Sequence, residues 1–68
     1  MNPINLLKIE WNKRFHEVKD NPERLLNLKN DFYTAHKEEI NIYKMPWFIN
    51  FYEKVGERYE EMLGQVSA

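Results

Sequence analysis

Hydrophobic residues recur every three or four positions in three stretches of the chain, which is the spacing of an amphipathic helix. The predicted helices cover residues 3–19, 22–43 and 46–63. The middle stretch carries two hydrophobic stripes about 120° apart, so this helix is expected to contact two neighbours. The stripes are formed by Ile4, Leu7, Trp11, Phe15 and Val18 in the first stretch, by Leu25, Leu28, Phe32 and Ala35 and by Leu26, Tyr33 and Ile40 in the second, and by Phe48, Phe51, Tyr52, Val55, Tyr59, Met62 and Leu63 in the third.

Each predicted helix begins at a proline, a residue that is tolerated in the first turn and disfavours helix in the residue before it. Asn2 and Asn21 precede the first two prolines and are good N-caps. Lys44 and Met45 precede Pro46 and cap poorly, so an irregular turn is expected there. Gly64 predicts the end of the third helix, with a frayed tail after it.

The connections near residues 19–21 and 43–45 are short, which makes consecutive helices antiparallel. The sequence therefore predicts an all-α fold, a small three-helix bundle running up-down-up, with residues 1–68 as a single helical domain. The alternative is a helical hairpin whose third helix packs on a partner chain. The predicted shared core consists of Trp11, Phe15, Leu25, Leu28, Phe32, Phe48, Val55 and Tyr59.

Size and composition narrow the class of protein further. The 68 residues contain no cysteine, which excludes disulfides, cysteine-based zinc sites and thiol catalysis. Neither a signal peptide nor an apolar run of the roughly 18–20 residues that cross a bilayer is apparent. We therefore expect a cytoplasmic protein that does not bind membranes. The abundance of Asn, Lys and Ile is compatible with a bacterial or bacteriophage source.

Residues suited to catalysis or metal binding are sparse. Ser67 and Thr34 are not placed beside a histidine, and glycines are isolated rather than grouped in a phosphate-binding loop. His36 and Glu39 form an i,i+3 pair, but a metal site needs three or four ligands. A histidine at the edge of the core beside a solvated carboxylate is the simpler interpretation. We expect no enzymatic activity, no cofactor and no metal site.

Basic residues prevail in the first helix, where Lys8, Lys13 and Arg14 raise the alternative of a small nucleic-acid-binding regulator. Two observations weigh against it. Lys8, Lys13 and Lys19 project in different directions, and Arg14 is spaced to pair with Glu10. The third helix carries an acidic face rather than the basic stripe of a recognition helix. The acidic face consists of Glu53, Glu57, Glu60 and Glu61. Nucleic acid is therefore the less favoured partner.

Some large apolar residues do not fit a core on one side of each helix. Leu6, Ile9, Trp47 and Ile49 lie off the main stripes, and Met45 precedes them in an aromatic-rich segment. Such side chains are typical of interfaces. We therefore expect a non-enzymatic protein-interaction module that self-associates, binds and regulates a larger protein, or does both. The alternative is that Met45 and Trp47 pack the start of the third helix against its loop.

Overall fold

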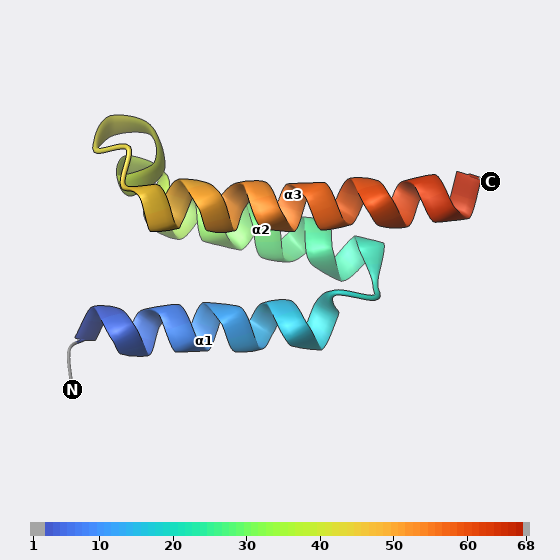
Figure 1. The fold of residues 1–68 in the computed structure, drawn as a ribbon, viewed down its shortest axis with the longest axis horizontal. Helices are drawn as coiled ribbons and strands as arrows, with labels where there is room; N and C mark the ends of the chain where they lie inside the picture. Colours follow the sequence, from blue (N-terminus) through green and yellow to red (C-terminus); the bar gives the residue numbers. More distant parts are fainter. Residues whose placement is uncertain (1–2, 68) are drawn as a thin grey trace.

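The computed structural model describes residues 3–67 of the chain, with side chains for residues 3–64. These residues form α1 (Pro3–Val18), α2 (Pro22–Lys37), a π-helical turn η1 (Glu38–Ile42) and α3 (Pro46–Ser67), and no strand is found among them. The chain runs along α1, returns along α2 and runs forward again along α3 (Figure 1). The predicted all-α, up-down-up three-helix bundle is confirmed.

The start of α2 has the cap that the sequence predicts. The Asn21 side chain accepts a hydrogen bond from the backbone N–H of Arg24 at 3.1 Å, and the predicted cap Asn2 lies outside the described residues. The start of α3 is irregular, as expected. Lys44 has a positive φ of 52°, and the Met45 carbonyl accepts from the amides of Phe48 and Ile49, each at 3.1 Å.

The middle helix departs from the prediction of one helix over residues 22–43. His36 has non-helical angles (φ −131°, ψ 27°), and α2 ends at Lys37. In η1 the Tyr43 amide donates to the Glu38 carbonyl, five residues back, at 2.9 Å. The wider turn changes the angular spacing of the residues within it, and Ile40, the last member of the second predicted stripe, is buried in the core. Hydrophobic periodicity does not detect this change, because the pattern assumes one rotation per residue throughout.

The third helix is longer than predicted, because it continues through Gly64 to Ser67. Gly64 does not adopt a positive φ, and no atom within 4 Å occupies the position that a Cβ would take. The residue therefore behaves as an ordinary helical position rather than as a stop. Ala68 lies outside the described residues.

The core lies mainly between α2 and α3, with η1 closing one end. Phe32 is at its centre, with ring centroids 4.6 Å from Phe51 and 4.9 Å from Trp11. The buried residues are Leu25, Leu28, Phe32, Ile40, Phe48, Phe51 and Val55. The prediction included five of these and missed Ile40 and Phe51. The predicted core residues Trp11, Phe15 and Tyr59 are half-buried and pack against the cluster.

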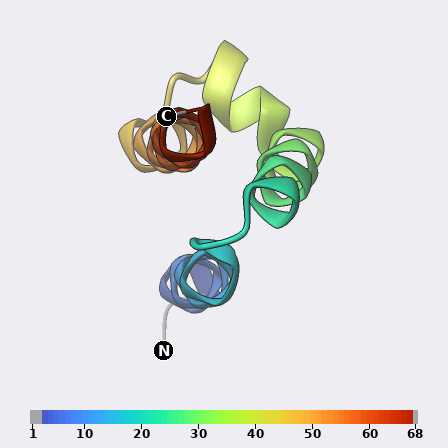
Figure 2. The same ribbon diagram turned by 90° about the vertical axis from the view of Figure 1, so that its right-hand side faces the viewer.

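The first helix is attached less tightly than the other two. Seen along the bundle, the three helices stand at the corners of a triangle (Figure 2), but α1 contributes no buried residue. Its half-buried side chains rest on the core from outside. Polar contacts also join it to its neighbours. Arg14 pairs with Asp31 of α2 at 3.0 Å, and Arg58 of α3 donates to the Lys19 carbonyl, next to α1, at 2.8 Å.

Candidate interaction surface

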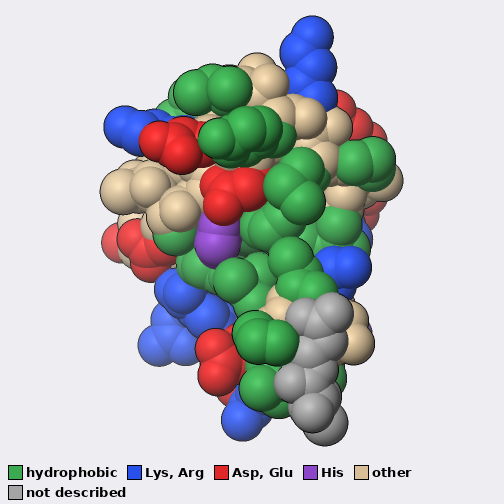
Figure 3. All heavy atoms as spheres, turned by 90° about the vertical axis from the view of Figure 1, so that its left-hand side faces the viewer, with side chains coloured by type: hydrophobic (Ala, Val, Ile, Leu, Met, Phe, Trp, Pro, Cys, Tyr) green, Lys and Arg blue, Asp and Glu red, His purple; other side chains and the backbone are tan. Residues whose placement is uncertain are grey.

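Five exposed apolar side chains lie on α1, on η1 or between η1 and α3, in the half of the bundle where α1 and α3 begin. Figure 1 places η1 at this same end, and Figure 3 shows hydrophobic side chains spread across it. We call this set the apolar end. Its members, with the exposed fraction of each, are Leu6 (48%), Ile9 (58%), Ile42 (69%), Tyr43 (66%) and Met45 (39%). Large exposed apolar patches on monomeric proteins mark interaction sites.

The five residues that the sequence predicts for interaction differ in their exposure to solvent. Leu6, Ile9 and Met45 are exposed. Trp47 and Ile49 are half-buried and pack against the core. All five lie in the first halves of α1 and α3 or just before α3, but they do not form one continuous set of exposed side chains.

Sequence reasoning missed the two most exposed members of the apolar end, Ile42 and Tyr43. Ile42 belongs to neither hydrophobic stripe of the middle segment, and this position off the stripes is the sequence feature that could have indicated its exposure. Ile42 ends the π turn and Tyr43 follows it, whereas Ile40 within the turn is buried. A hydrogen bond from Asn41 Nδ2 to the Tyr33 hydroxyl, 2.7 Å long, links the turn to α2.

His36 lies at the kink before this turn, among aromatic rings. Its ring centroid is 4.9 Å from Phe48 and 5.7 Å from Trp11. Its Nδ1 is buried without a hydrogen-bond partner among the described residues, and the nearest carboxylate oxygen of Glu39 is 3.7 Å away. That distance is too long for a hydrogen bond. No group of three or more possible metal ligands occurs within the described part of the chain.

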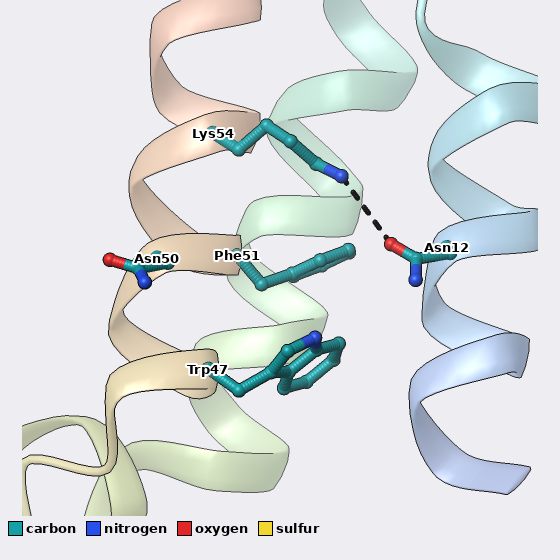
Figure 4. A pocket seen from close by; sticks show the side chains of 5 residues that line it. All are labelled: Asn12, Trp47, Asn50, Phe51 and Lys54. Carbon is teal, nitrogen blue, oxygen red and sulfur yellow. Dashed lines mark hydrogen bonds between the residues drawn. The ribbon is translucent and has the colours of Figure 1, made fainter. Parts of the chain in front are cut away.

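A small cavity of about 120 Å³ opens between α1 and α3. In Figure 4 the side chains of Trp47, Phe51 and Lys54 point from α3 toward α1, and Asn12 faces them. The Lys54 ammonium donates to the Asn12 side-chain oxygen at 3.4 Å. We call this cavity the α1–α3 groove. It is lined by Asn12, Trp47, Asn50, Phe51 and Lys54.

A second cavity, about 230 Å³ in volume, lies beside α2 and α3 and has an acidic rim. Lys29 extends across it, with its ammonium 5.2 Å from the Tyr52 ring centroid. The other lining residues are Glu53, Gly56, Glu57 and Glu60. Three of the four acidic residues predicted on the outer face of α3 therefore line a shallow depression, whereas Glu61 pairs with Arg58 at 3.2 Å.

The basic residues of α1 are partly engaged within the molecule. Arg14 pairs with Asp31 of α2 rather than with Glu10 as predicted, and its guanidinium lies 4.5 Å from the Trp11 ring centroid. The neighbouring helix supplies a carboxylate, and stacking on Trp11 fixes the guanidinium. The Lys8 ammonium lies 5.7 Å from the Trp47 ring centroid.

None of the described helices combines the length and the apolar character needed to cross a membrane. Comparison of the chain with models of protein families, with curated proteins and with solved structures finds no match.

Proposed function

We propose that this protein is a non-enzymatic interaction module that uses its apolar end to self-associate, to bind and regulate a larger protein, or to do both. The exposure of Ile42 and Tyr43 beside a small core is the observation that supports the proposal. A cytoplasmic setting, expected from the sequence, is part of it.

The energetics of burial support docking through a few side chains. Covering one large apolar side chain is worth about 1.5–3 kcal/mol. Two or three residues of the apolar end therefore supply enough free energy for a modest dimer or a docking site. Tyrosine and methionine, which are represented by Tyr43 and Met45, are enriched at interfaces because they contribute large contact areas.

The nucleic-acid alternative has less support. Arg14 already pairs with Asp31, and α3 carries an acidic cavity rim rather than a basic stripe. A salt titration separates the two functions, because phosphate contacts give binding a steep salt dependence.

The proposal is tested with the double variant Ile42→Ser/Tyr43→Ser. Analytical ultracentrifugation measures self-association, and an immobilised copy of the protein retains partners from an extract of the native cell, which mass spectrometry identifies. We expect the variant to keep its helical circular dichroism and to lose association or the retained partner.

The matched control is Leu26→Ser/Leu63→Ser, which changes two exposed apolar residues outside the apolar end. This control should associate like the wild type. A wild type that stays monomeric and retains no partner that the apolar-end variant loses would contradict the proposal.

A further inference from the structure

The α1–α3 groove has the form of a site for one more helix. α1 and α3 run in the same direction (Figure 1), and α1 contributes no buried residue. The rings of Trp47 and Phe51 stack on each other 5.2 Å apart, with an interplanar angle of 19°, and both reach from α3 toward α1 (Figure 4). A fourth helix across such a groove would complete a four-helix arrangement.

The charges at the groove favour an acidic occupant. The Lys54 ammonium lies 4.7 Å from the Phe15 ring centroid and 5.3 Å from that of Phe51, and the Lys8 ammonium lies beside Trp47. Neither lysine is within ion-pair distance of a carboxylate in the described part of the chain. Two ammonium groups beside aromatic rings complement a ligand that combines apolar side chains with carboxylates.

We propose that the α1–α3 groove binds an acidic amphipathic helix of a partner protein. An apolar side chain of that helix enters the cavity over Trp47 and Phe51, while its carboxylates pair with Lys8 and Lys54. The cavity of about 120 Å³ accommodates a side chain rather than a helix, so the partner helix lies across the rim. This inference rests on the proposed function and names the chemical class of the partner.

The test uses two fluorescein-labelled peptides of about 18 residues, long enough to form helix. Both carry leucine at helical spacing, and the remaining positions hold alanine with glutamate in one peptide and glutamine in the other. Fluorescence anisotropy measures their binding to the full chain. We expect the glutamate peptide to bind about ten-fold more tightly than its glutamine counterpart, since each partly exposed ion pair contributes roughly a two- to five-fold gain.

The variant Lys8→Gln/Lys54→Gln should weaken binding of the glutamate peptide about ten-fold and leave the glutamine peptide unchanged. Lys29→Gln is the matched control, because Lys29 also lies over an aromatic ring but belongs to the acidic cavity. It should have no effect. In two-dimensional NMR spectra, the Asn12 side-chain amide and the Trp47 indole should shift when the glutamate peptide binds.

Several results would overturn the inference. The inference is wrong if the two peptides bind with equal affinity, or if neither peptide binds at about 1 mM. It is also wrong if the double lysine variant binds the glutamate peptide as tightly as the wild type does. Displacement of the glutamate peptide by a single-stranded oligonucleotide that binds more tightly would overturn it as well. Concentration-dependent shifts of Asn12 and Trp47 without peptide would assign the groove to a second copy instead.

The two proposals fail in different ways. If Ile42→Ser/Tyr43→Ser abolishes association while neither peptide uses the groove, the groove inference is wrong and the proposed function stands. If the glutamate peptide binds as expected but the wild type neither associates nor retains a partner through the apolar end, the proposed use of that end is wrong.

Discussion

The Arg58 Nε of α3 donates a hydrogen bond to the Lys19 carbonyl at 2.8 Å, directly after the end of α1. The same guanidinium donates to the Asp20 carboxylate at 2.8 Å. One side chain of the last helix thus holds the connection between the first two. It satisfies a carbonyl that has left the helical hydrogen-bond pattern, and it helps to place α1, which lacks buried residues of its own.

Replacing this side chain should therefore loosen the α1–α2 connection. We expect Arg58→Ala to lower the free energy of unfolding by about 1–2 kcal/mol, the range for a hydrogen bond from a charged group in a partly exposed setting. Urea denaturation measures the change. Asp20→Asn is the control and should cost less than about 0.5 kcal/mol, because the Asp20 side chain is mostly exposed. Equal losses in both variants would assign the effect to the surface ion pair alone.

Phe32 should dominate the stability of the core. The side chain is fully buried and contacts rings from α1 and α3, so Phe32→Ala should cost about 3–5 kcal/mol. That is comparable to the entire stability of a domain of this size, so the variant should be largely unfolded by circular dichroism. Leu26, an exposed residue of the same helix, serves as the control. Leu26→Ala should cost less than about 1 kcal/mol, and a nearly neutral Phe32→Ala would contradict the observed packing.

Replacement of Lys44 by glycine should stabilise the fold. Its φ of 52° is strained for a residue with a Cβ, so Lys44→Gly is expected to raise the free energy of unfolding by about 0.5–1 kcal/mol. Lys37→Gly provides the opposite control, because Lys37 has ordinary helical angles and glycine there should cost about 1 kcal/mol. Chemical denaturation of both variants checks the pair. A loss of stability in Lys44→Gly would show that the turn does not need this conformation.

His36 should be replaceable by phenylalanine. Its buried Nδ1 lacks a hydrogen-bond partner among the described residues, and the ring already packs among aromatic side chains. Removing an unsatisfied polar atom in such a setting should stabilise the fold by about 0.5–1 kcal/mol. Glu39→Gln, the control for the 3.7 Å contact, should change little. If thermal unfolding shows instead that His36→Phe and Glu39→Gln both destabilise, the two side chains interact more strongly than their separation implies.

The sequence contained enough information for most of the fold. Pro22 and Pro46 mark helix starts because proline restricts the backbone in the same way wherever it occurs, and both starts are confirmed. Leu25, Leu28 and Phe32 could be placed in the core because α2 has regular geometry up to His36. Beyond that residue the pattern was less informative. A π turn contains one more residue than an α-helical turn. Tertiary contacts stabilise this extra residue, and no local sequence preference specifies it.

The candidate surface could be predicted only in part. The exposure of Leu6 and Ile9 follows from their positions opposite the inward stripe of α1. Ile42 and Tyr43 could not be assigned in this way, because Ile42 ends the π turn and Tyr43 follows it. The distance between α1 and α3 cannot be derived from the sequence either. This distance determines that Trp47 lines a groove and is not buried in the core. Whether these residues bind a partner remains a prediction.

The shallow attachment of α1 implies that the chain has two levels of stability. Backbone amides of α2 and α3 near Leu28 and Val55 are expected to exchange with deuterium only through global unfolding. The amides of α1 should exchange through a local opening that exposes less apolar surface than global unfolding and costs less free energy. Native-state hydrogen exchange monitored by NMR would resolve the two levels as separate cooperative units. An opened α1 would uncover the aromatic side of α3 while the α2–α3 hairpin persists, so that one small chain has a compact form and an extended form available to it.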